Sequence, residues 1–216
     1  SLQIDRGLDS IGIISPSNFY HCTGNYERYK KYIKKEVYQD EQEGLVMFHH
    51  RKASIGKVNL ENAHPFIGKR YMLMQNGTSR WIWSNYGDVF GKGTDTETIL
   101  AYLEYRRTEF EDIPAMLKKL SDKCYKDEYG IIMVNDMETN RILIYADGDR
   151  ESHIEIEDGK LISFRNYKSV SDDYGFENEG YMIVDFDGNI LENTFENYRF
   201  IYGESRTVYW LRVPYI

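Results

Sequence analysis

The chain has 216 residues, with 27 Lys and Arg against 35 Asp and Glu, so its formal net charge at pH 7 is −8. This acidic balance without a dense basic patch argues against nucleic acid as the main partner and against binding to an anionic membrane surface. No apolar run approaches the ~18 residues that a membrane-spanning helix needs, and the N-terminus does not resemble a signal peptide.

The two cysteines, Cys22 and Cys124, lie far apart and in unrelated contexts. They predict neither a disulfide framework nor a metal site with Cys-x-x-Cys spacing. We therefore expect a soluble, cytoplasmic protein without a metal or another cofactor. No repeat, low-complexity tract or linker divides the sequence, so we expect a single domain over residues 1–216.

The first half of the chain contains strand patterns and one helical pattern. Short apolar runs predict strands over residues 11–15, 45–49 and 70–74. The last of these strands runs directly into Asn76-Gly77, a common turn dipeptide. Apolar and aromatic positions spaced for a helix occur over residues 26–36.

Between residues 94 and 123 the pattern becomes helical. Thr94 or Asp95 can cap a first helix, because short polar side chains accept hydrogen bonds from the free N–H groups of a first turn. A second helix is expected to start near Pro114, since proline is tolerated in a first helical turn.

After residue 129 the sequence alternates between strand patterns and turns. Candidate strands cover residues 130–135, 141–146, 152–157, 160–166, 181–186 and 207–213. Turns suited to positive φ are expected at Asp147-Gly148, Asp158-Gly159 and Asp187-Gly188. Helices flanked by many hairpin-connected strands indicate an α+β fold with helices layered on antiparallel sheets.

Five short motifs in the first half carry the functional signal. They are Arg6-Gly7-Leu8-Asp9-Ser10-Ile11-Gly12, His49-His50-Arg51-Lys52-Ala53-Ser54-Ile55-Gly56, Glu61-Asn62-Ala63-His64-Pro65-Phe66, Gln75-Asn76-Gly77 and Thr94-Asp95-Thr96-Glu97. Each is weak alone, because Arg6-Gly7 and Asn76-Gly77 can be ordinary turns, Asp95 a helix cap and Arg51 a surface ion pair.

In this order and spacing, the motifs resemble the glutaminase domain of the class II amidotransferases, which are N-terminal-nucleophile hydrolases. The match is close over residues 6–97 and looser over the later strands. The resemblance implies a four-layer αββα sandwich with two mostly antiparallel sheets. It also implies hydrolysis of glutamine to glutamate and ammonia, and transfer of that ammonia to a partner synthetase.

The resemblance assigns a role to each motif, and the chemistry of glutamine is compatible with these roles. Arg51 would bind the α-carboxylate, because a guanidinium fork matches two carboxylate oxygens. Asp95 would accept hydrogen bonds from the α-ammonium. The Asn76 side chain and the backbone N–H of Gly77 would form the oxyanion hole.

Three further residues receive less specific roles from the resemblance. Arg6 and Gly7 would line the pocket beside the nucleophile. His64 either shapes the rim of the site or is a structural histidine.

The sequence departs from the family at the nucleophile, which is the thiol of an N-terminal cysteine. No such cysteine precedes Arg6, Ser1 lies too close to Arg6, and Cys22 is not terminal. Three explanations stay open: a segment missing from the sequence as given, a cleaved chain, or a degenerate member that never had the cysteine. The intact binding motifs favour the first two.

Three functions therefore compete. The first is a glutaminase domain that supplies ammonia to a partner. The second is a catalytically inactive binding or structural subunit of a larger assembly that keeps the fold. The third is an N-terminal hydrolase acting on another amide, against which the pairing of Arg51 with Asp95 argues, because those residues suit a free α-amino acid.

Overall fold

The computed structural model describes residues 9–16, 19–24, 44–124, 130–166 and 177–195. Within these ranges the strands form two sheets in which all pairings are antiparallel. The smaller sheet has the order β2-β1-β3, and its strands are β1 (Ser10–Ile14), β2 (Phe19–Thr23) and β3 (Met47–Arg51).

The larger sheet has seven strands in the order β10-β9-β7-β6-β5-β4, with β8 paired to β7. Its strands are β4 (Phe66–Ile67), β5 (Tyr71–Asn76), β6 (Ile131–Asp136), β7 (Arg141–Glu157), β8 (Lys160–Asn166), β9 (Glu177–Asp185) and β10 (Ile190–Asn193). The helices are α2 (Arg80–Phe90), α3 (Asp95–Tyr105) and α4 (Ile113–Ser121), with the 3-10 turn η2 (Phe110–Asp112) before α4.

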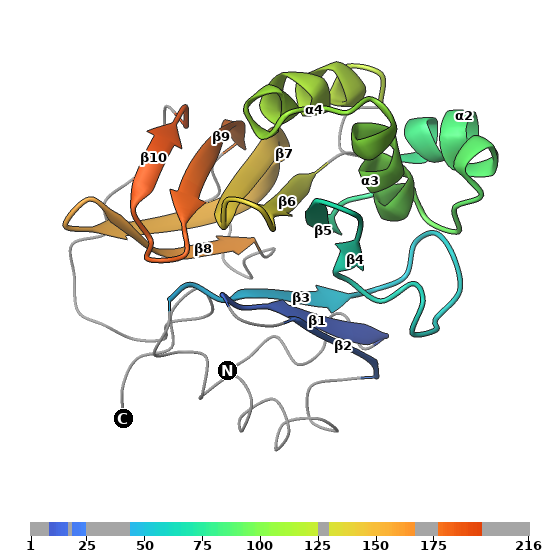
Figure 1. The fold of residues 1–216 in the computed structure, drawn as a ribbon, viewed down its shortest axis with the longest axis horizontal. Helices are drawn as coiled ribbons and strands as arrows, with labels where there is room; N and C mark the ends of the chain where they lie inside the picture. The colour runs from blue at the N-terminus through green and yellow to red at the C-terminus, as the bar shows by residue number, and fades with distance from the viewer. Residues whose placement is uncertain (1–8, 17–18, 25–43, 125–129, 167–176, 196–216) are drawn as a thin grey trace.

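The strands of the larger sheet bury apolar side chains on both faces. On one face, Leu73 and Leu143 pack in a core with Leu103 of α3 and other helical residues. On the opposite face, Met74 packs in a second core that includes Met47 of the smaller sheet. Residues two apart on a strand share a face, so the alternation along β5 places the larger sheet between the helices and the smaller sheet (Figure 1).

This helix–sheet–sheet order agrees with the predicted α+β fold of αββα type. The helix expected over residues 26–36 and the strand over residues 207–213 lie outside the described residues. The expected turns at Asp158-Gly159 and Asp187-Gly188 are confirmed, with positive φ at Asp158, Gly159 and Gly188.

The turn expected at Asp147-Gly148 was wrong, because β7 runs without interruption from Arg141 to Glu157. Asp147 remains in the sheet as the partner of Glu179, and the register shifts only between Asp147 and Glu151. Its carboxylate accepts a hydrogen bond from the backbone N–H of Gly130 at 3.0 Å. The Asp-Gly pair therefore marks a bulge that bends a long strand.

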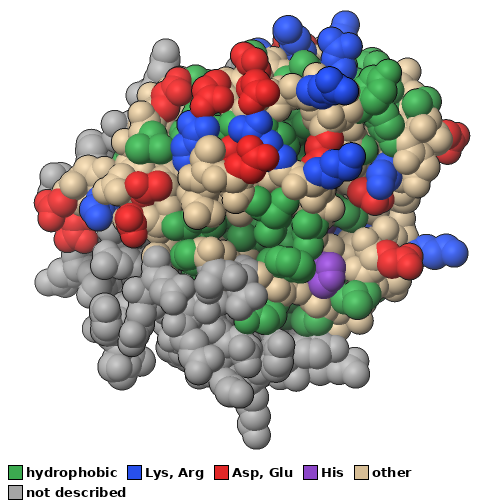
Figure 2. Space-filling model, viewed as in Figure 1, with side chains coloured by type: hydrophobic (Ala, Val, Ile, Leu, Met, Phe, Trp, Pro, Cys, Tyr) green, Lys and Arg blue, Asp and Glu red, His purple; other side chains and the backbone are tan. Residues whose placement is uncertain are grey.

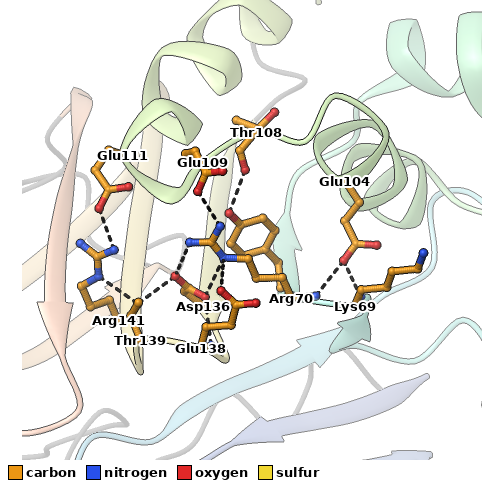
Figure 3. Close-up of polar contacts among 11 residues, drawn as sticks. Lys69, Arg70, Glu104, Thr108, Glu109, Glu111, Asp136, Glu138, Thr139 and Arg141 are labelled. Atoms are coloured by element: carbon orange, nitrogen blue, oxygen red, sulfur yellow. Dashed lines mark hydrogen bonds and ion pairs between the residues drawn. The ribbon is translucent and has the colours of Figure 1, made fainter.

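Charged side chains gather at the end of the larger sheet where β5 begins (Figure 3). We call this group the Arg70 network; it consists of Arg70, Glu109, Asp136 and Glu138. Arg70 donates to both carboxylate oxygens of Asp136, at 3.2 and 3.1 Å, and to Glu109 at 2.7 Å. Glu138 lies 3.3 Å from the same guanidinium.

The outer surface near the helices carries acidic and basic side chains side by side. Figure 2 shows this mixture on the face that it draws. None of the helices within the described ranges is long and apolar enough to cross a membrane.

Candidate functional site

The segments that carry the motifs meet where β3 and β5 end and α3 begins. The backbone N–H of Ala53, just after β3, donates to the carboxylate of Asp9 at 2.7 Å. The Thr78 hydroxyl, just after β5, donates to the Ser54 hydroxyl at 2.9 Å. These contacts join the first motif, the second motif and the residue directly after the fourth, which are far apart in sequence.

The loop after β3 also packs closely against the start of α3. A Cβ atom on Gly56 would lie 2.8 Å from both the carbonyl oxygen of Gly93 and the methyl group of Thr94. Only glycine permits this approach. The Thr94 side chain then caps α3 by accepting from the N–H of Glu97 at 3.2 Å, as the capping pattern predicted.

Arg51, the last residue of β3, is buried with 5% of its surface exposed. Its guanidinium donates to the carbonyl oxygens of Ile55 at 2.7 Å and Lys57 at 3.4 Å. A guanidinium has five N–H donors, so these two bonds order the loop and use only part of its donor capacity. Burial lowers the pKa of Arg51, while the charges of Asp95 and Asp9 act in the opposite direction.

Asp95, the first residue of α3, is buried with 4% of its surface exposed. Its carboxylate accepts from the backbone N–H of Ser79 at 2.6 Å. Burial raises the pKa of Asp95, although hydrogen bonds from Ser79 and Thr96 and the charge of Arg51 counteract this shift. The N-terminal end of a helix also favours a negative charge.

Arg51 and Asp95 thus carry opposite charges that influence each other's pKa. Among the described residues, however, the ion pairs do not include one between them. Each is hydrogen-bonded to backbone atoms instead. A small molecule with both a carboxylate and an ammonium group suits such an arrangement.

Asn76 ends β5, and its side chain is exposed, while Gly77 follows it at the surface end of the strand. Gly130 supports this turn from the neighbouring segment. Gly130 has a φ of +70°, and a Cβ atom there would lie 2.2 Å from the carbonyl oxygen of Asn76. The position of the Asn76–Gly77 backbone therefore depends on the absence of a side chain at residue 130.

His64 is buried behind the end of β5, with 4% of its surface exposed. Its ring contacts that of His49, with centroids 4.1 Å apart and the ring planes tilted by 38°. His64 Nδ1 accepts from the Gln75 N–H at 3.5 Å, and His49 Nε2 donates to the Gln75 carbonyl at 2.8 Å. Of the two roles considered for His64, these contacts favour the structural one.

Arg6 and Gly7 lie outside the described residues, so their predicted position beside the nucleophile stays a prediction. Asp9, from the same motif, lies against the loop after β3. The described residues contain no group of three or more His, Cys, Asp or Glu side chains that could hold a metal ion.

Sequence reasoning missed three residues that support the site. Gln75 and Ser79 flank the Asn76–Gly77 turn, and Gly130 packs against it. Gln75 stood inside a motif, but only its neighbours received a role. Nothing in the local pattern around Gly130 links it to a turn some fifty residues earlier.

The curated relatives that resemble this chain are named as glutamine–fructose-6-phosphate aminotransferases. The isomerizing glutamine–fructose-6-phosphate aminotransferase of Buchnera aphidicola is 26% identical over 66% of this chain. The enzyme of the same name from Helicobacter pylori is 24% identical over 89% of this chain. The matched parts span only 25% and 38% of these relatives. No family model matches the chain.

A solved structure shares the fold. Glutamine phosphoribosylpyrophosphate amidotransferase from B. subtilis superposes with a TM-score of 0.54 and 17% sequence identity. The superposition covers 91% of this chain and 45% of that protein. Together with the curated relatives, it confirms the resemblance to class II glutamine amidotransferases and the fold class that the motifs implied.

Proposed function

We propose that this chain is a single domain that binds L-glutamine and forms the glutaminase part of a class II amidotransferase. The observation that carries the proposal is the pair Arg51 and Asp95. Both are buried and oppositely charged, and both are bonded to backbone rather than to each other. A free α-amino acid presents a carboxylate and an ammonium on one carbon, so it can satisfy both residues at once.

In this proposal, the Arg51 guanidinium binds the α-carboxylate and Asp95 accepts from the α-ammonium. The glutamine side chain then extends toward Asn76 and Gly77. The side-chain amide of Asn76 and the N–H of Gly77 donate to the oxygen of the tetrahedral intermediate, where charge develops. Arg6 and Gly7 would line the pocket beside the nucleophile.

The reaction needs a nucleophile, which would be the thiol of an N-terminal cysteine outside these 216 residues. Its thiolate would attack the side-chain amide carbon, with the α-amino group of the same residue as base, because an α-amine titrates near ~7.7–8.0. Collapse of the intermediate releases ammonia and leaves a thioester. Water then releases glutamate, and the ammonia passes to a synthetase partner in the cytoplasm.

Isothermal titration calorimetry with amino acids tests the binding part. L-glutamine is expected to bind, whereas D-glutamine and glutaramate, which lacks the α-ammonium, are expected to bind at least about tenfold more weakly. Arg51→Ala should lower the affinity for L-glutamine about 100-fold, because it leaves the carboxylate without its charged partner. Arg51→Lys keeps the charge but loses the fork, so it should restore only part of the affinity. Equal affinities for both enantiomers would contradict the site assignment.

Intact mass and N-terminal sequencing of natively purified protein, combined with a glutamate-release assay, test the catalytic part. A chain heavier than 25.6 kDa that begins with cysteine and releases glutamate supports the glutaminase. A chain that begins at Ser1, binds glutamine and releases no glutamate supports the inactive binding or structural subunit.

A further inference from the structure

We propose that Gln75 is a positioning residue that fixes the distance between the oxyanion turn and the carboxylate of Asp95. The inference rests on the proposed function and names a residue to which no role was assigned. Gln75 precedes Asn76-Gly77 and is buried, with 3% of its surface exposed. It does not need to touch glutamine, because its effect passes through its neighbours.

The side-chain amide of Gln75 joins two segments of the site. Its Nε2 donates to the Ser79 hydroxyl at 2.7 Å, and its Oε1 accepts from the Thr96 hydroxyl at 3.1 Å. Ser79 follows Asn76 by three residues and is the N-cap residue of α2, and Thr96 lies in the first turn of α3 beside Asp95. One planar amide therefore spans the gap between the two groups that are proposed to bind opposite ends of glutamine.

Ser79 extends this link to Asp95 directly. The Ser79 hydroxyl accepts from Gln75, and the Ser79 backbone N–H donates to the Asp95 carboxylate. Ser79 is fully buried and Thr96 is 3% exposed, so water does not compete freely for these bonds. Losing the Gln75 amide would leave two buried hydroxyl groups to find new partners.

The backbone of Gln75 is held as firmly as its side chain. At this point of β5, the edge that faces away from β6 is covered by the rings of His49 and His64, which bond to the Gln75 carbonyl and N–H. Because these rings hold the backbone at this point, the length and shape of the side chain bear directly on the separation between the Asn76–Gly77 turn and α3.

Three variants of the full chain test this role. Gln75→Leu removes both side-chain bonds at similar size, Thr96→Val removes one, and Thr96→Ser keeps the hydroxyl. Calorimetry with L-glutamine should show a loss of affinity of about tenfold or more for Gln75→Leu, about threefold for Thr96→Val, and less than twofold for Thr96→Ser.

Tyr71→Phe is the matched control for lost stability. It removes a buried bond from the Tyr71 hydroxyl to the Thr108 carbonyl at 2.8 Å, on the same strand but away from the site. It should lower the melting temperature by an amount similar to Thr96→Val without changing glutamine affinity. If Tyr71→Phe lowers the affinity for glutamine as much as Gln75→Leu does, Gln75 contributes only to general stability and the positioning proposal fails.

Amide hydrogen exchange at Ser79 separates this inference from the proposed function. Gln75→Leu should speed exchange of the Ser79 N–H that donates to Asp95 by about tenfold, even if the wild-type chain binds no glutamine. If the wild-type chain binds no glutamine but Gln75→Leu still speeds this exchange, the proposed function is overturned. The link that Gln75 makes between the Asn76–Gly77 turn and the first turn of α3 is then still supported. Unchanged exchange, or unchanged glutamine affinity in a chain that binds it, would overturn the role of Gln75.

Discussion

Strand β5 carries polar networks at both ends, and the two are satisfied in different ways. At its start, the Arg70 guanidinium bonds to the carboxylates of Asp136, Glu109 and Glu138, so each charge has an opposite charge as its partner. At its other end, Arg51 and Asp95 bond to backbone atoms rather than to one another. The first arrangement stabilises the fold. In the proposed function, the second keeps two desolvated charges apart, which costs stability and leaves both charges for glutamine.

Replacing Asp95 by asparagine gives the largest expected effect on binding. Affinity for L-glutamine should fall about 100-fold or more, because the ammonium loses its charged partner. The ligand-free chain should melt at the same or a higher temperature. The pKa of Asp95 is raised by burial, so its stabilising contribution is present at low pH and lost as pH rises through that pKa. Calorimetry at neutral pH checks the loss of affinity, and thermal melts at neutral pH check the melting temperature.

Asp136→Ala should produce the opposite pattern. Asp136 is fully buried, and burial acts to raise its pKa, but hydrogen bonds from Arg70, Thr139 and the N–H of Glu138 outweigh burial and lower it. Removing this carboxylate leaves the Arg70 guanidinium without its central partner, at a cost of about 3 kcal/mol in unfolding free energy. Urea denaturation measures the loss. Glutamine affinity should stay within about twofold. A large loss of affinity would mean that the two ends of β5 are coupled.

Gly130→Ala tests the turn at the Asn76 end against a matched glycine. Gly130 and Gly159 both have positive φ, at +70° and +75°, but a Cβ on Gly159 would meet nothing within 4 Å. Both substitutions cost about 1 kcal/mol of backbone strain. Only Gly130→Ala also pushes the Asn76 carbonyl, adding about 1–2 kcal/mol and weakening glutamine binding. Equal losses of stability and of glutamine affinity in the two variants would show that Gly130 does not support the site.

Acid should loosen the Asn76 end before the Arg70 end. Burial lowers the pKa of His49 to about 4 and that of His64 well below 6.5. Both rings are therefore neutral in the folded chain near neutral pH. The contribution of His49 is complete above pH 6.5 and is lost as pH falls toward 4, and that of His64 is also lost as pH falls. The unfolding free energy should therefore fall as the pH is lowered from 6.5 to 4.

The lowered pKa of Asp136 means that its stabilising contribution is lost only at lower pH. Hydrogen exchange at Gln75 and Arg70, followed from pH 6.5 to 4, distinguishes the two ends. His49→Gln keeps a donor for the Gln75 carbonyl and should flatten the pH dependence.

The smallest effect is expected for Glu109→Ala. Glu109 pairs with Arg70 at 2.7 Å, but its side chain is 66% exposed. Exposed ion pairs contribute little, so the unfolding free energy should fall by less than about 1 kcal/mol. A loss in urea denaturation as large as that of Asp136→Ala would show that the Arg70 network acts as one unit.

Much of the fold was predictable, because its elements follow local patterns. Strands β1, β3, β5 and β6 and helices α3 and α4 occur close to where apolar spacing and caps indicated them. Helix α2 was missed, because its Trp81 and Trp83 suit a strand pattern as well as a helix. Asn76-Gly77 immediately before it also suggested a hairpin.

The site was predictable as a set of motifs but not as a set of contacts. The motifs named Arg51, Asn76 and Asp95, and the resemblance assigned them roles. The links from Gln75 to Thr96 and from Gly130 to Asn76 join residues more than twenty positions apart. Such contacts depend on how the elements pack, which spacing within one segment does not encode.

The connections between strands also bear on the order in which the chain assembles. Strands β6 and β7 pair as consecutive strands, as do β9 and β10, so hairpin closure can begin parts of the larger sheet quickly. The pairing of β1 with β3 must close the long segment between Ile14 and Met47, and such closures carry a greater entropic cost. Arg51 pairs with Ser10 across these two strands, so its position depends on that closure. In the proposed function, a ligand that requires Arg51 would therefore bind only molecules in which the smaller sheet has formed.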